Sequence, residues 1–159
     1  MKRSINLLAS LVCVSFAICA FATTYNGAGT WQSSNGTSGE YTVGAQIEMV
    51  DEDNLNINQT LNFGNETLNI NVVIHKTDDT FFDVINADTN EVIGAGYCFP
   101  FGDAQDSKIC HSDSVAGDEF IESTIKLTPR AIFRMGSKTN LSNGDKTVWK
   151  DTLHPSVQE

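Results

Sequence analysis

The chain has 159 residues, of which 40% are hydrophobic and 19% are charged, and its 10 Lys+Arg against 20 Asp+Glu give a net charge of −10. This composition is typical of one globular domain and excludes an intrinsically disordered chain. Because nucleic acids are themselves polyanions, the excess of carboxylates also argues against any nucleic-acid partner.

The first 22 residues have the pattern of an export signal. Lys2 and Arg3 form a short basic start, an apolar run follows, and Ala20-Phe21-Ala22 offers the small residues after which signal peptidases cleave. We therefore predict a signal peptide over 1–22, cleavage after Ala22, one domain over 23–159, and a secreted or periplasmic protein. The apolar run is too short for a stable span, so we expect no stable membrane insertion of the mature chain.

Apolar and polar residues alternate along most of the remaining chain, which is the period of half-buried β-strands. The clearest example runs over 55–63, and the pattern resumes over 68–74 after the turn residues Gly64-Asn65, which predicts a hairpin. No segment predicts an amphipathic helix of three turns. About ten strands are expected, over 29–34, 40–50, 55–63, 68–74, 80–86, 91–99, 108–115, 119–127, 130–139 and 146–153.

Short connections between consecutive strands favour an antiparallel meander, and closing such a meander removes its exposed edges. We therefore predict an all-β fold, an antiparallel up-and-down β-barrel of about eight to ten strands. A β-sandwich is the structural alternative that periodicity leaves open. A small outer-membrane barrel would share the alternation and the export route, but the polar C-terminus and the absence of aromatic girdles disfavour it.

Cleavage after Ala22 would leave two cysteines, Cys98 and Cys110. In an oxidising compartment a disulfide is expected, and the turn-forming residues between them allow two flanking strands to fold back on each other. A metal site that adds His111 is disfavoured, because neighbouring residues of a strand point to opposite faces. We predict a disulfide, no metal site and no cofactor.

The two ends of the chain carry a resemblance to a known superfamily. Gly29-Thr30-Trp31 is similar to the Gly-x-Trp start of the calycins, which include lipocalins and avidins, and 148–153 resembles the closing strand of avidin-like barrels. The resemblance implies a calycin-like barrel in which Trp31 packs beneath a basic side chain, Arg134 or Lys150. With two tryptophans in all, the chain lacks the set that walls a biotin pocket, so specific biotin binding is not expected.

A barrel of this size is either filled by its side chains or holds one small ligand. Large residues spread over several strands are the candidates for its interior: Trp31, Phe63, Phe82, Phe133, Met135 and Trp149. Concave sites with mostly aromatic linings are typical of small-molecule binding, whereas the same residues could simply form a packed core. We predict a non-catalytic binding protein for a small apolar ligand.

Neither a nucleophile elbow, a zinc-protease motif, a phosphate loop nor a dinucleotide fingerprint occurs in the sequence, and we therefore expect no enzyme. A different class of function follows from the charge. A small acidic exported protein would be attracted to cationic partners, as expected of an inhibitor or scavenger that binds a cationic protein.

Overall fold

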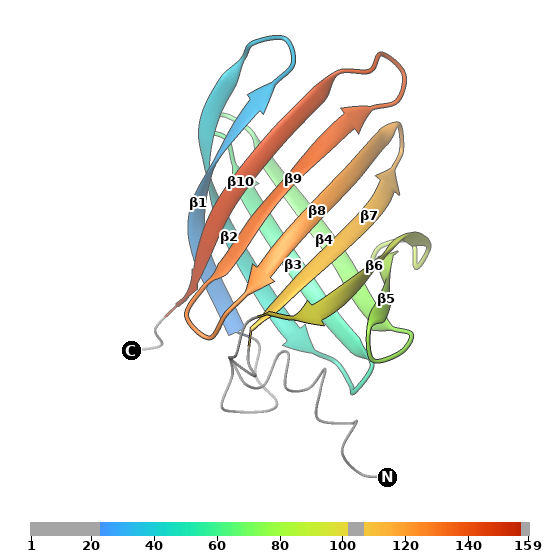
Figure 1. Cartoon of the computed structure of the whole chain (residues 1–159). Helices are drawn as coiled ribbons and strands as arrows, with labels where there is room; N and C mark the ends of the chain where they lie inside the picture. Colours follow the sequence, from blue (N-terminus) through green and yellow to red (C-terminus); the bar gives the residue numbers. More distant parts are fainter. Residues whose placement is uncertain (1–22, 102–106, 157–159) are drawn as a thin grey trace.

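The structure is a computed structural model that describes residues 23–101 and 107–156. The predicted signal peptide, 1–22, lies outside the described residues. Ten strands make up most of the described chain (Figure 1): β1 (Thr23–Ser33), β2 (Ser38–Met49), β3 (Asn54–Asn62), β4 (Thr67–Lys76), β5 (Phe81–Asn86), β6 (Val92–Pro100), β7 (Lys108–Ala116), β8 (Glu119–Leu127), β9 (Ile132–Asn140) and β10 (Lys146–Pro155). No helix long and apolar enough to cross a membrane occurs among these residues.

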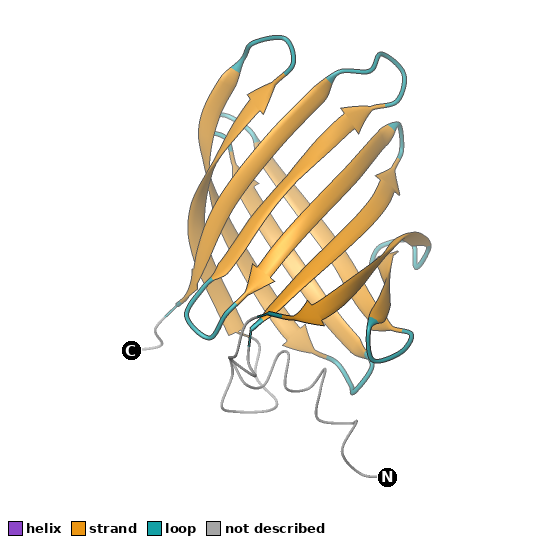
Figure 2. Ribbon diagram, viewed as in Figure 1, coloured by secondary structure: helices purple, strands orange, loops and turns teal. Residues whose placement is uncertain are grey.

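The ten strands form one closed barrel (Figure 2). Each strand pairs antiparallel with the next strand in the chain, and β1 closes the barrel by pairing with β10 over nine residue pairs, from Tyr25–Pro155 to Ser33–Thr147. The predicted up-and-down barrel is therefore confirmed, and the sandwich is excluded. β1 begins at Thr23, earlier than predicted, because its first half is polar or small apart from Tyr25 and shows little alternation.

The two ends of the barrel differ. The connections β1–β2, β3–β4, β5–β6, β7–β8 and β9–β10 lie at one end, here called the hairpin end, and each contains one residue with a positive φ: Gly36, Gly64, Asn90, Gly117 and Gly144. Glycine or asparagine suits these tight turns because the left-handed conformation is strained for other residues. Thr23 and Ser156 lie at the opposite end, here called the terminal end (Figure 1).

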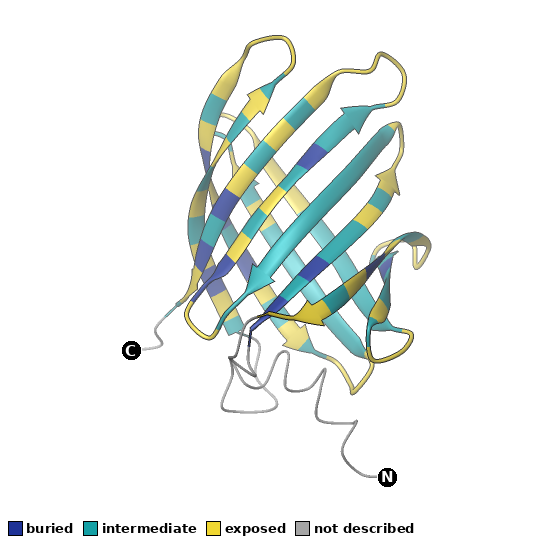
Figure 3. Cartoon of the chain, in the orientation of Figure 1, coloured by how far each residue is buried: buried dark blue, intermediate teal, exposed yellow. Residues whose placement is uncertain are grey.

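The packed core lies toward the terminal end (Figure 3). Its buried members come from four neighbouring strands, β1, β2, β9 and β10: Tyr25, Tyr41, Val43, Ala45, Ile132 and Leu153. Leu153 is the most completely enclosed, with 1% of its surface exposed. Burial of these side chains stabilises the closed barrel by roughly 1.5–3 kcal/mol for each large apolar residue.

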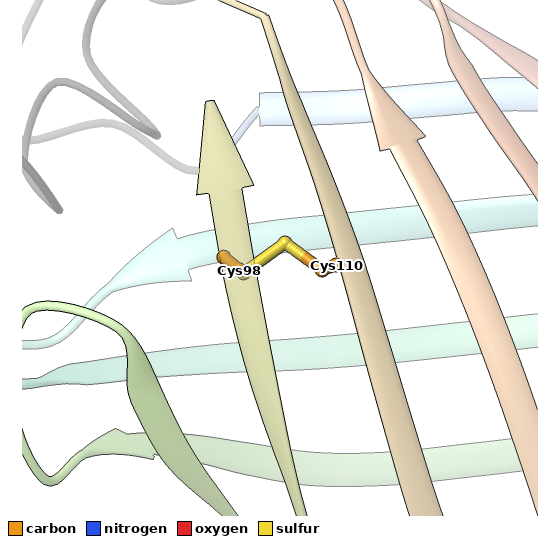
Figure 4. Close-up of a disulfide and its surroundings, with 2 residues drawn as sticks. All are labelled: Cys98 and Cys110. Atoms are coloured by element: carbon orange, nitrogen blue, oxygen red, sulfur yellow. A yellow bond between two sulfur atoms is a disulfide. The ribbon is translucent and has the colours of Figure 1, made fainter. Parts of the chain in front are cut away.

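A disulfide joins Cys98 and Cys110, as predicted (Figure 4). Cys98 on β6 and Cys110 on β7 are directly paired in the sheet, with their Cα atoms 4.0 Å apart. Cys110 is buried on the inner face, and His111 lies on the opposite face. The bond therefore fixes two adjacent strands to each other.

Candidate functional site

The inner wall of the barrel is only partly sealed from solvent. On β10, inward-facing Leu153 at the terminal end is buried, but inward-facing Trp149, nearer the hairpin end, is half-buried. Every residue of β8 is half-buried, including the inward-facing Ile121 and Ser123. A completely filled core would bury such positions, so part of the inner wall remains accessible to solvent. This accessible inner wall is the candidate site.

Aromatic side chains form one side of the candidate site. Trp31 on β1 and Trp149 on β10 are direct neighbours in the sheet, so their side chains point to the same, inner face. Phe63, which follows β3, lies against the ring of Tyr41 with 5.2 Å between the ring centroids. Phe82 faces inward from β5 on another part of the wall. The structure thus places four of the six predicted interior residues on the inner face.

The other two predicted residues lie on the outside, which corrects the sequence interpretation. Phe133 is 43% exposed and Met135 is 59% exposed. Their neighbours Ile132 and Arg134 occupy the inward positions of β9. The prediction chose the alternation phase of this strand by apolar side-chain size, whereas the structure places an arginine inside and leaves two large apolar residues in solvent.

Four inward-facing aromatic rings are each matched by a glycine on a neighbouring strand, which the sequence pattern did not predict: Trp31, Tyr41, Phe82 and Trp149. A Cβ atom at Gly136 would lie 2.5 Å from the ring of Trp149, and one at Gly39 would lie 2.9 Å from the indole nitrogen of Trp31. The rings therefore lie flat against the wall where side chains are missing, an arrangement that shields the glycine backbone.

A buried polar network crosses the interior beneath the two tryptophans. The Arg134 guanidinium donates to both carboxylate oxygens of Asp151, with Nε–Oδ1 and Nη2–Oδ2 distances of 2.8 Å. Its third nitrogen donates to the Gln59 side-chain oxygen, and the Tyr41 hydroxyl donates to Asp151 Oδ2 at 2.6 Å. The Asp151 side chain is fully enclosed, and that of Arg134 is 10% exposed. Such bidentate pairs are strong and geometrically specific.

The network is electrically balanced, which limits what it can bind. Asp151 neutralises Arg134, so this network offers no uncompensated positive charge to an anionic ligand. Burial, and secondly the Asp151 carboxylate, hold the pKa of Tyr41 well above its usual range, so this hydroxyl remains a neutral donor. Arg134 also lies over the Trp149 ring, 5.9 Å from its centroid. The resemblance implied a cation over Trp31 instead, and Lys150 is exposed on the outer face.

The wall beside the two tryptophans, on β7 and β8, is more polar. Ser112 and Ser123 are paired across β7 and β8 and face inward, half-buried. Near the hairpin end, Lys138 and Glu119 form an ion pair at 2.7 Å, with roughly two fifths of each side chain exposed. Among the described residues, no three His, Cys, Asp or Glu side chains are grouped closely enough to hold a metal ion. The site therefore combines aromatic surface, two hydroxyl groups and a charged pair near the hairpin end.

The sequence matches no protein-family model and no curated protein. Two solved structures have a similar fold over nearly their whole length. The S-type phycobiliprotein lyase CPES from Guillardia theta is 11% identical with a TM-score of 0.65, covering 100% of this chain and 99% of the lyase. Rv2717c from M. tuberculosis is 8% identical with a TM-score of 0.59, covering 99% of each chain. These similarities extend to the fold, and they agree with the closed antiparallel barrel of ten strands.

The similarity to a lyase corrects the prediction that this chain is not an enzyme. That prediction was wrong because it depended on the absence of sequence motifs, and those motifs belong to other folds, such as doubly wound sheets and zinc-protease helices. A protein named as a lyase has a similar barrel fold, so this fold does not exclude catalysis.

Proposed function

We propose that the mature, exported protein binds one small, mostly apolar molecule against the inner wall near the hairpin end. The observation that carries this proposal is the gradient of burial inside the barrel. Inward-facing Leu153 is 1% exposed, whereas Trp31 and Trp149 face the same interior and remain half-buried. A ligand seated against the two indole rings would remove this apolar surface from water, which is favourable by roughly 25 cal/mol per Å².

The chemistry of the wall defines the class of ligand. The indole rings suit an apolar or aromatic body, and the hydroxyl groups of Ser112 and Ser123 suit one polar edge of it. Because Asp151 already neutralises Arg134, a neutral molecule fits the deeper part of the site better than an anion. Export is supported by the position of β1, since removal of 1–22 leaves all ten strands intact, and by the disulfide.

Tryptophan fluorescence can detect binding at the site, because the only two tryptophans of the chain are Trp31 and Trp149. Energy transfer from indole to the neutral apolar dye N-phenyl-1-naphthylamine should therefore reveal binding in the purified mature protein. Ser112→Phe should abolish transfer, because it places a ring on the inner wall. Asp113→Phe is the matched control, since the adjacent residue points outward, and it should leave transfer unchanged.

Native mass spectrometry of gently purified protein, followed by solvent extraction, then identifies any small molecule that co-purifies with the protein. A co-purifying small apolar molecule that Ser112→Phe no longer retains supports the proposal. Absence of any bound molecule, together with no dye transfer and no ligand-induced rise in melting temperature, would overturn it. Export is tested separately by sequencing the N-terminus of the secreted or periplasmic protein, which should begin at Thr23.

A further inference from the structure

The outer wall carries an exposed aromatic surface on one side of the barrel, here called the aromatic patch. It spans β5 to β9 near the terminal end and consists of Phe81, Tyr97, Phe99, Phe101, Phe133 and Met135, whose exposed fractions range from 37% to 59%. Ring centroids lie 6.4 Å apart for Phe81–Tyr97 and 5.3 Å apart for Tyr97–Phe99. The sheet register links Phe99 through Ile109 and Lys126 to Phe133, so the patch is continuous.

The size of the aromatic patch matches one half of a protein–protein interface. At about 200 Å² for each fully exposed large side chain, six residues exposed by about one half present roughly 600 Å². One partner in a standard interface contributes about 800 Å², of which roughly 60% is apolar. The largest apolar patch on a soluble monomer is about 300–600 Å² and is often functional.

The charges of the aromatic patch are opposite in sign to those of the whole protein. Two neighbouring rows of outward residues cross it, Phe81–Tyr97–His111–Thr124–Met135–Lys150 and Phe99–Ile109–Lys126–Phe133–Thr152, and neither row contains a carboxylate. Lys126 lies over the Phe101 ring, 4.3 Å from its centroid. Since the chain has 20 acidic and 10 basic residues, this is a face by which two copies can approach with little repulsion.

An open groove of about 960 Å³ adjoins the aromatic patch on the same outer wall. Its lining includes outward-facing residues of β8, β9, β10, β1 and β2, and it shares Met135 with the patch. Val148 contributes apolar surface, and Glu40 and Glu122 contribute carboxylates. Lys150 and His111 also line the groove, so the wall presents an aromatic surface that contains Lys126 beside a groove of mixed charge with two carboxylates.

The disulfide holds the centre of the aromatic patch in place. Cys98 lies between Tyr97 and Phe99, and its bond to Cys110 ties β6 to β7 directly behind the exposed rings. A surface whose shape is fixed before binding loses less conformational entropy when a partner docks.

We propose that the partner of the aromatic patch is a second copy of this chain. In a two-fold dimer the patch of each copy would lie in the groove of the other, with Lys126 facing the Glu40 carboxylate. A two-fold interface requires one wall that carries both complementary surfaces, as this wall does. An anionic membrane fits less well because of the net charge of −10, and a cationic protein would meet Lys126. This proposal is independent of ligand binding inside the barrel.

Sedimentation equilibrium of the oxidised mature protein between about 1 and 200 μM tests this proposal. The wild-type protein should show a monomer–dimer equilibrium. Phe99→Glu and Val148→Glu, which alter the patch and the groove respectively, should each weaken dimerisation by about a hundredfold. Leu141→Glu is the matched control, because Leu141 is 59% exposed in the β9–β10 turn at the hairpin end. It should leave the dimerisation constant unchanged.

Melting curves of the three variants establish that each still folds, as expected for exposed positions. A wild-type protein that stays monomeric at 200 μM overturns the proposal. A dimer that Phe99→Glu disrupts and Val148→Glu does not would overturn the seating of the patch in the groove. Monomeric protein that co-sediments with vesicles of phosphatidylcholine and phosphatidylglycerol would overturn it in favour of a lipid surface.

Discussion

Replacing Asp151 by alanine should destabilise the barrel by about 3–5 kcal/mol, because it leaves a buried guanidinium without its counter-charge. The Asp151 side chain is fully enclosed and accepts hydrogen bonds from Arg134 at 2.8 Å, twice, and from Tyr41 at 2.6 Å. Arg134 also donates to Gln59, and its side chain is only 10% exposed in the native barrel. Water therefore has little room to replace the lost carboxylate.

Urea unfolding followed by tryptophan fluorescence measures this loss, since Arg134 lies over the Trp149 ring. With a urea dependence of about 1–3 kcal/mol/M, the midpoint should fall by roughly 2 M. Arg134→Met and the double variant complete a mutant cycle, in which the double variant should be more stable than the sum of the two single losses predicts. Asp53→Ala, in an exposed turn, is the control and should change stability by less than about 0.5 kcal/mol.

A loss below about 1 kcal/mol for Asp151→Ala, with additive free energies in the cycle, would refute this reasoning. That result would mean that the carboxylate and the guanidinium are hydrated within the barrel and that the interior is wet at the level of Arg134. The network could then not serve as the floor of an apolar site above it.

Three further outcomes are expected. Cys98→Ser should lower the melting temperature by roughly 10 °C relative to the oxidised protein, from a chain-entropy contribution of about 3 kcal/mol, and the reduced wild type should melt with the variant. Because burial raises the pKa of Tyr41, the unfolded chain releases the tyrosine proton at a lower pH than the folded barrel does. The contribution of Tyr41 to the free energy of unfolding is therefore complete below about pH 10 and is lost as the pH rises further. Tyr41→Phe should reduce this loss of stability in urea titrations at alkaline pH. Gly96→Ala should lower the free energy of unfolding in urea by about 2 kcal/mol, because its Cβ would overlap the Phe82 ring. Gly44→Ala is the control and should lower it much less, since the nearest atom to its Cβ would be 3.6 Å away. Equal losses would contradict the packing argument.

The strands could be predicted because their signal is local. Apolar and polar residues alternate over 55–63 and over 68–72, and the period alone predicts strands with one face inward. The disulfide was equally predictable, since cleavage at the predicted signal-peptide site would leave two cysteines and therefore a single intramolecular pairing. The first half of β1 was missed because its small and polar residues become a strand only through pairing with β2 and β10.

The orientation of β9 could not be predicted, because it depends on distant partners. Hydrophobicity favours Phe133 and Met135 as the inward residues, yet the structure turns Arg134 inward. The inward guanidinium is stabilised by the Asp151 carboxylate on β10 and by the Gln59 side-chain amide on β3. Gln59 is 75 residues away from Arg134 in the chain. No local pattern in the sequence identifies these two partners. In a wrong register Arg134 would lack them and would be an uncompensated charge inside the barrel.

The same inversion on β9 links the interior to the exterior of the barrel. Turning Arg134 inward creates the polar layer beneath Trp149, and by alternation it turns Phe133 and Met135 outward into the aromatic patch. A wall selected only for a packed core would place those two side chains inside, where each would contribute roughly 2 kcal/mol on burial. Their exposure is therefore costly unless the outer face also binds something. The arrangement of this one strand thus favours a barrel that uses both faces of its wall, the inner one for a small molecule and the outer one for a second copy of the chain.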